Sequence, residues 1–185
     1  MGFQSEANAV LLPLRLIQKA MFAYGWTKPE KVSAVAHTMK DGVPIDMTTT
    51  LLFGTGQSAS FTNSFSSAFR QTAAFVGTGQ SLDIDDFTLA GEESTGCGFN
   101  LWREHGLTDN ALLVTKKVEH VKVEYEHPQE VAMWIKFAEL AQATAGEARE
   151  AERAFYANIA LDTQKVLDAC MESSLLEGAA VNVAE

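Results

Sequence analysis

The chain has 185 residues, of which 46% are hydrophobic and 21% charged, as is ordinary for a soluble globular protein. Its formal net charge of −10 disfavours nucleic acid as a partner, because an acidic surface repels a phosphate backbone. It has neither an apolar stretch long enough to cross a bilayer nor a basic and then apolar N-terminus, which excludes a membrane span and a secretory signal. We therefore expect a soluble protein of the cytoplasm or of an organelle interior.

The first predicted element is an amphipathic helix at Val10–Tyr24. Its apolar residues recur at steps of three and four, which is the period of one helix face. Pro13 is tolerated only in a first turn, so we expect the regular helix to begin near Leu12. Gly25 ends it.

A run of strands follows, because apolar and polar residues alternate from Val32 to Ile84. Asp41-Gly42 and two Gly-Thr-Gly corners separate the individual runs. The segment 86–117 has a weaker pattern, with one strand expected in it. The predicted strands are Lys31–Met39, Ile45–Phe53, Ser58–Phe69, Gln71–Gly77, Ser81–Ile84, Gly98–Glu104 and Glu119–Tyr125.

Two helices are predicted after the strands. Pro128 suits the first position of one helix, which ends near Gly146 and has an apolar side. The second helix runs from about Phe155 to Leu176 and is stopped by Gly178. The apolar side of the earlier helix consists of Val131, Trp134, Ile135, Phe137 and Leu140.

The order of the elements predicts the fold class. A helix, a run of antiparallel strands and two more helices are typical of an α+β fold. We expect a single, mostly antiparallel open sheet with the helices packed on one face and the other face available for an interface. Residues 1–185 are expected to form one domain, with its core from about residue 10 to residue 178.

The letters GTGQS occur twice, at Gly54–Ser58 and Gly77–Ser81, and raise the question of a phosphate-binding loop. A dinucleotide fingerprint needs a third glycine and a following helix, whose N-terminus holds the pyrophosphate. The third glycine is replaced by Ala59 in one copy and by Leu82 in the other, and strand-like sequence follows both. We therefore interpret both as hairpin corners, in which glycine supplies the positive φ of a tight turn.

Two further polar clusters are candidates for chemical sites. His120 and His127 lie near several glutamates, but His120 and Glu124 alternate with apolar residues, which is typical of the solvent side of a strand. The aspartates at 83, 85 and 86 end a strand in a turn-like cluster. The two cysteines, Cys97 and Cys170, predict neither a disulfide framework nor a zinc site. The sequence thus predicts no catalytic, cofactor-binding or metal-ligating residue.

One surface of the predicted sheet is unusual because it is almost uncharged. Arg70 is the only charged residue between Met47 and Leu82. Phenylalanines at 53, 61, 65 and 69 would share one face, whereas a solvated opposite face normally carries Lys and Glu. That opposite face is predicted to bind a protein partner or a second copy, although a neutral solvated surface is the alternative. The predicted interface residues are Thr48, Thr50, Thr62, Ser64, Ser66, Arg70, Thr72 and Ala74.

Three segments resemble a known family. They are "SFTNSFSSAFRQTAAFVGTGQSLDIDDFTL", "HPQEVAMWIKFAEL" and "FYANIALDTQKVLDACMESS". Together they are similar to the C-terminal domain of the Gfo/Idh/MocA oxidoreductases, most of all to the dihydrodiol and xylose dehydrogenase-like branch. The resemblance runs from about Leu11 to Val183, and it implies an α+β domain whose open sheet face makes oligomer contacts.

The sequence departs from that family in two ways. Family enzymes begin with an NAD(P)-binding Rossmann domain that carries an E-K-P motif, which this sequence lacks; the letters "TKPEK" at Thr27–Lys31 precede a strand and do not match it. The family's first helix here has D-x-G-x-Y or D-x-G-x-H beside the substrate. The segment Leu11–Ala23 contains no Asp, Tyr or His. The positions implied for that motif are occupied by Leu11 or Leu12, Pro13 or Leu14, and Arg15 or Leu16.

These observations leave two main readings of function. The preferred one is a non-catalytic structural or interaction subunit, without a cofactor, that associates through its uncharged sheet face. The alternative is the C-terminal half of an NAD(P)-dependent sugar or dihydrodiol oxidoreductase whose Rossmann half is either on another chain or missing from this sequence. A third reading, a binder of small ligands, is disfavoured because no polar cluster marks a pocket.

Overall fold

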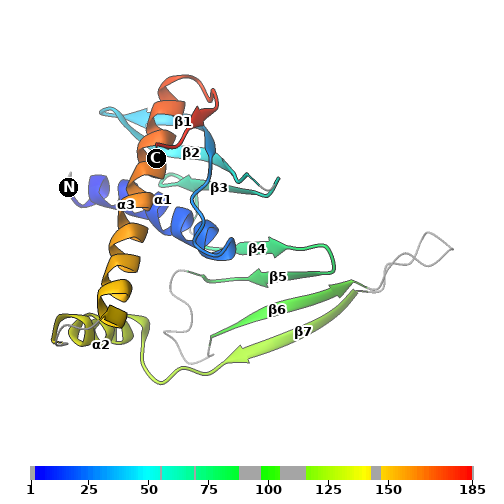
Figure 1. Ribbon diagram of the computed structural model, residues 1–185. Coiled ribbons are helices and arrows are strands. Elements are labelled where there is room, and N and C mark those ends of the chain that lie inside the picture. Colours follow the sequence, from blue (N-terminus) through cyan, green and yellow to red (C-terminus); the bar gives the residue numbers. More distant parts are fainter. Residues whose placement is uncertain are drawn as a thin grey trace. The chain divides into compact units, whose positions relative to one another are not determined.

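The computed structural model describes residues 3–54, 56–68, 70–87, 97–104, 116–142 and 147–184. It divides the chain into two compact units, one of Met1–Ala68 with Thr144–Glu185 and one of Phe69–Ala143 (Figure 1). Within the described ranges the fold is α+β, as predicted, with three helices and two antiparallel sheets. The prediction of a single sheet is therefore wrong.

The first unit consists of a four-stranded sheet and two long helices. The sheet, called the first sheet here, has the order β3-β2-β1-β8 and is antiparallel throughout. Asp41 and Gly42 join β1 to β2 with φ values of 52° and 81°, as the predicted tight turn requires. The elements are α1 (Phe3–Ala23), β1 (Lys31–Lys40), β2 (Val43–Leu52), β3 (Ser58–Ser64), α3 (Glu147–Leu175) and β8 (Val181–Asn182).

The core of the first unit lies between this sheet and its helices. Ile17 and Met21 of α1 face the sheet at the predicted helical spacing, and Val166 of α3 is buried with them. Alternate residues of the strands meet them, so that each strand has one buried face. Burial of each such side chain contributes about 1.5–3 kcal/mol. The strand residues in this core are Val32, Ala34, Met47 and Leu51, with Phe53 just beyond β2.

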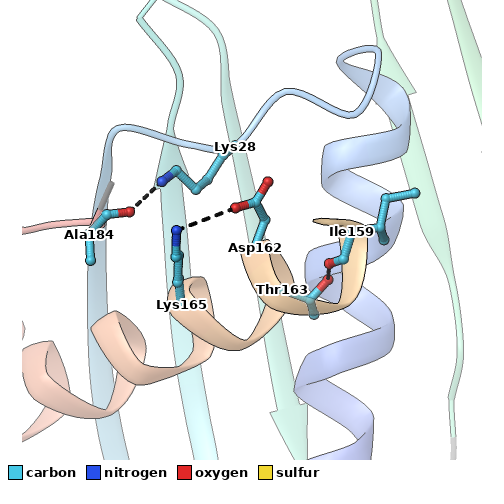
Figure 2. A network of polar contacts seen from close by, with 6 residues as sticks. All are labelled: Lys28, Ile159, Asp162, Thr163, Lys165 and Ala184. Carbon is cyan, nitrogen blue, oxygen red and sulfur yellow. Dashed lines mark hydrogen bonds and ion pairs between the residues drawn. The ribbon is translucent and has the colours of Figure 1, made fainter. Parts of the chain in front are cut away.

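Polar contacts tie the C-terminal segment to this unit. The Ser173 side chain is fully buried; its Oγ accepts a hydrogen bond from the Ala34 amide at 2.8 Å and donates one to the Ala179 carbonyl at 2.7 Å. Lys28 Nζ donates to the Ala184 carbonyl (Figure 2).

Two further contacts in Figure 2 lie within α3. Thr163 Oγ1 donates to the Ile159 carbonyl at 2.6 Å, and Lys165 forms an ion pair with Asp162 at 3.9 Å.

The described residues of the second unit form another four-stranded sheet and one helix. Its sheet, called the second sheet here, is antiparallel with the order β4-β5-β6-β7. Among the described residues of this unit, Phe87 alone is buried. The elements are β4 (Ala73–Val76), β5 (Gln80–Ile84), β6 (Cys97–Glu104), β7 (Lys116–Val123) and α2 (Gln129–Gln142).

Element boundaries differ from the predictions for local reasons. The third strand ends at Ser64 rather than at Phe69, because Ser64 Oγ accepts hydrogen bonds from the amides of Ser66 (3.2 Å) and Ser67 (3.0 Å) and so closes a turn. Helix α3 begins at Glu147, eight residues before the predicted start. The prediction began later because the first turns of the helix are charged and show no apolar period. Helix α1 begins at Phe3 and contains Pro13 within its length. No helix in the described ranges is long and apolar enough to cross a membrane.

Candidate protein-interaction face

The candidate site is the face of the first sheet that points away from the buried core. Because side chains alternate along a strand, residues between the buried positions of β1, β2 and β3 share this second face. At β1, the turn after α3 contacts this face: the Gly178 carbonyl accepts a hydrogen bond from Ser33 Oγ at 2.7 Å. We call the remainder the hydroxyl face. It consists of His37, Asp46, Thr48, Thr50, Ser60, Thr62, Ser64 and the adjoining Ser66.

A ladder of hydrogen bonds crosses the hydroxyl face from strand to strand. Thr48 Oγ1 lies 2.9 Å from His37 Nε2 on one side and 3.1 Å from Thr62 Oγ1 on the other. Thr50 Oγ1 lies 3.0 Å from Ser60 Oγ, one step further along the same two strands. The Thr48–Thr62 and Thr50–Ser60 pairs sit directly opposite each other in the β2–β3 register. The ladder therefore gives these side chains hydrogen-bond partners within the face.

Asp46 closes one end of the ladder and is its one carboxylate. Ser66 Oγ lies 2.8 Å and 2.7 Å from its two carboxylate oxygens, and Ser64 Oγ also donates to it. The hydrogen bonds from Ser64 and Ser66 stabilise the charged form and lower the pKa of Asp46 to about 2. Sequence reasoning missed Asp46 because the uncharged stretch was counted from Met47. The period-two spacing of Asp46, Thr48 and Thr50 was the signal that could have found it.

The structure brings together only part of the predicted interface. Thr48, Thr50, Thr62, Ser64 and Ser66 lie on the hydroxyl face. Arg70, Thr72 and Ala74 belong to the second unit, where β4 pairs with β5. Their assignment to one face assumed a single sheet. That assumption fails because the chain leaves the first sheet at the Ser64 turn. Of the four phenylalanines predicted for the opposite face, Phe53 and Phe61 pack on the core, Phe65 is exposed, and Phe69 lies outside the described residues.

The GTGQS corners are hairpin connections, as predicted. The first joins β2 to β3, with the Gly56 amide donating to the Phe53 carbonyl at 3.1 Å, and the second joins β4 to β5. Only the first uses the expected backbone freedom: Gly56 has a φ of 78°, whereas neither Gly77 nor Gly79 has a positive φ. Because strands follow both corners, neither presents a helix N-terminus to an anion.

Two residues of the histidine and glutamate cluster, His120 and Glu119, take part in cross-strand contacts of the second sheet. His120 Nδ1 lies 3.0 Å from Asn100 Oδ1 on the neighbouring strand. Glu119 pairs with Arg103 at 3.2 Å, on the surface. Within the described parts of the chain, no group of three or more His, Cys, Asp or Glu side chains is arranged to hold a metal ion. Cys170 is a buried free thiol of the first unit, and its burial raises its pKa to about 12.

Comparison with known proteins gives the fold but no close relative. No protein-family model and no curated protein matches the sequence. Solved structures do match: a Bacillus subtilis protein named as the oxidoreductase yvaA has a TM-score of 0.65 at 14% identity, over 94% of this chain and 52% of that chain. An NAD binding oxidoreductase from Klebsiella pneumoniae has a TM-score of 0.61 at 14% identity, over 94% and 49%.

A protein from Desulfitobacterium hafniense, named as an NADPH-dependent oxidoreductase, gives a TM-score of 0.62 at 16% identity, over 94% of this chain and 47% of that chain. The present chain thus spans about half the length of the solved structures that it matches. At these identities the likeness shows the fold alone. This chain has the fold of about half of an oxidoreductase of this kind.

Proposed function

We propose that this chain is a non-catalytic association module with an oxidoreductase-type fold, and that a protein partner binds its hydroxyl face. The observation that carries the proposal is the neutrality of the face. Apart from Asp46 at one end, the imidazole of His37, and Lys31 opposite Leu52 at the other end, its side chains are mostly Thr and Ser hydroxyls, in a chain whose formal net charge is −10. A sheet face that stays in water usually carries Lys and Glu, which also prevent unwanted association.

The hydrogen-bond ladder lowers the cost of covering this face. Burying a hydroxyl without a partner is unfavourable, but Thr48, Thr50 and Thr62 already have partners within the face. Side chains that are already ordered also lose less conformational entropy on binding. The exposed Leu52 at the end of β2 adds apolar area beside the ladder. These properties suit close packing against a flat protein surface.

The first helix supports the absence of catalysis. By the resemblance to the Gfo/Idh/MocA oxidoreductases, an acid and a Tyr or His would stand in Leu11–Ala23. In α1 this segment instead contains the core residues Ile17 and Met21, while Arg15 is exposed. A leucine or proline cannot exchange a proton with a substrate alcohol. We therefore assign no catalytic residue and no cofactor to this chain.

A double variant of β2 tests the proposal. Thr50→Lys with Leu52→Lys places two cations on the face, and because β2 is an interior strand it leaves the edges of the sheet unchanged. We expect the complex isolated from the protein's own cells to lose its partner, seen as a drop in native mass. The matched control, Thr72→Lys with Thr78→Lys, alters exposed positions of the second unit and should keep the mass. An unchanged mass for the β2 variant overturns the proposal.

The second candidate function is the C-terminal half of an NAD(P)-dependent oxidoreductase acting on a sugar or dihydrodiol alcohol. The match to about half of three oxidoreductase structures favours it. Under this reading the native complex contains a dinucleotide-binding chain in equal amount and oxidises such alcohols with NAD(P). A complex that contains no such chain, or that has one but shows no oxidation, rejects it.

A further inference from the structure

Strand β3 forms an edge of the first sheet, and its free side is defined by its hydrogen bonds to β2. The Phe65 amide donates to the Ile45 carbonyl at 3.0 Å, and the Phe53 amide donates to the Gln57 carbonyl at 2.9 Å. In an antiparallel ladder such pairs alternate, so Phe61 and Asn63 also bond to β2. The backbone amides and carbonyls of the even-numbered residues, Ser58 to Ser64, therefore point to the free edge.

This edge differs from the other sheet edges in the described parts of the chain. An exposed strand edge is normally protected by charge, proline, a bulge or short length. Strand β8 has two residues and β4 has four, while β7 carries Lys117, Glu119 and Lys122. Strand β3 has seven residues, "SASFTNS", without charge or proline, and its pairing with β2 has no register shift. It has none of the usual protections.

We propose that β3 pairs edge to edge with β3 of a second copy of this chain, which joins two first sheets into one antiparallel sheet. This goes beyond the proposed binding of a partner on the hydroxyl face, because it uses backbone groups at the edge. Tyr24 Oη already donates to the Ser58 carbonyl at 2.8 Å, so the free run is Ser60–Ser64. A two-fold axis at Thr62 pairs Ser60 with Ser64 of the other copy and Thr62 with its own equivalent.

The register is consistent with the geometry and charge of the edge. In this register, Ser60 pairs with Ser64 of the other copy and Thr62 pairs with Thr62. These are the residues whose backbone amides and carbonyls point to the free edge, as a hydrogen-bonded pair requires. A two-fold contact of this kind closes on itself and gives a dimer, not a fibre. The Asp46 carboxylate contacts Ser64 and Ser66, beside one end of β3. Because the two β3 strands run antiparallel, the Asp46 carboxylates of the two copies would lie at opposite ends of the paired strands. The rest of the edge carries no charge that would repel a second acidic chain.

A proline at the axis tests this pairing with little effect on β2. Thr62→Pro removes an amide that points to the free edge, a position where an edge strand tolerates proline. We expect the wild-type chain to form a dimer in sedimentation equilibrium and Thr62→Pro to raise its dissociation constant about 100-fold. The control Thr62→Val keeps the amide and should keep the dimer. Unfolding curves check that the proline variant is folded.

Hydrogen exchange gives a readout that needs no variant. In the wild-type chain, the amides of Ser60, Thr62 and Ser64 should exchange more slowly as protein concentration rises. A wild-type monomer with freely exchanging amides overturns the inference and leaves the hydroxyl-face proposal to its own test. So does a dimer that survives Thr62→Pro but is lost in Thr50→Lys with Leu52→Lys, since that dimer would use the face. A dimer resistant to both variants rejects the edge inference as well.

Discussion

The two units of this chain bury their apolar residues very differently. The first unit has a continuous core from two helices and the strands β1 and β2, in which Ile17, Met21 and Leu51 are fully buried. In the second unit, Phe87 is the one buried residue among those described, and Trp134 and Phe137 of α2 are 62% and 60% exposed. Both units have regular secondary structure. Among the described residues, the second unit thus has regular hydrogen-bonded strands with few buried side chains, so the two units should respond differently to mutation.

The second sheet also has an apolar face, which its own unit leaves partly exposed. Residues directly opposite each other in the ladder share a face, so Phe75, Leu82, Leu101 and Ile84 lie on the same side of the sheet. All four are only partly buried. Hydrophobic burial is the main favourable term in folding. The second unit is therefore expected to contribute little free energy of unfolding by itself, and the first unit most of it.

The largest expected effect comes from one truncation made in both units. Ile17→Ala in α1 removes a side chain that is 0% exposed and should cost about 2–5 kcal/mol of the free energy of unfolding, because a cavity is left in the core. Ile135→Ala in α2 removes the same atoms from a side chain that is 43% exposed and should cost less than about 1 kcal/mol. Urea denaturation followed by circular dichroism measures both. Equal losses would show that the second unit has a core comparable to that of the first.

The periodicity and turn chemistry of the sequence were enough to predict most elements and the hairpins, because both are local. Gly56 and Asp41-Gly42 illustrate this, since each turn adopts the positive φ that its residues favour. The division into two sheets was not predictable in this way. The division depends on whether the strand after Ser64 pairs with β3 or with another strand. The alternating pattern of that strand is the same in both cases, so the sequence does not decide between them. The residues predicted for the candidate face include Thr72 and Ala74, which belong to the second unit, whereas Thr48, Thr50 and Thr62 lie on β2 and β3.

The buried Ser173 hydroxyl links α3 to β1 by hydrogen bonds that sequence periodicity does not predict. Ser173→Ala leaves the Ala34 amide and the Ala179 carbonyl without their buried partner, and should cost about 1–3 kcal/mol. Ser174→Ala is a matched control, because the Ser174 hydroxyl bonds only to Met171 of its own helix, at 2.7 Å. We expect the control to change stability by less than about 0.5 kcal/mol. Similar values for both would mean that the link between α3 and β1 adds little to the first unit.

The smallest expected effect is a pH dependence assigned to Asp46 in the first unit. Its pKa is about 2 in the folded chain and 3.8 in the reference state, so the folded state binds the proton less readily. The hydrogen bonds from Ser64 and Ser66 therefore stabilise the fold above the unfolded pKa, and this stability is lost as the pH falls through the folded pKa. Between about pH 4 and pH 2 the wild-type free energy of unfolding should fall more steeply than that of Asp46→Asn. If the free energies of unfolding of wild type and Asp46→Asn fall equally with pH, the Asp46 carboxylate does not gain stability from Ser64 and Ser66. A steeper fall for Asp46→Asn would contradict the lowered pKa of Asp46.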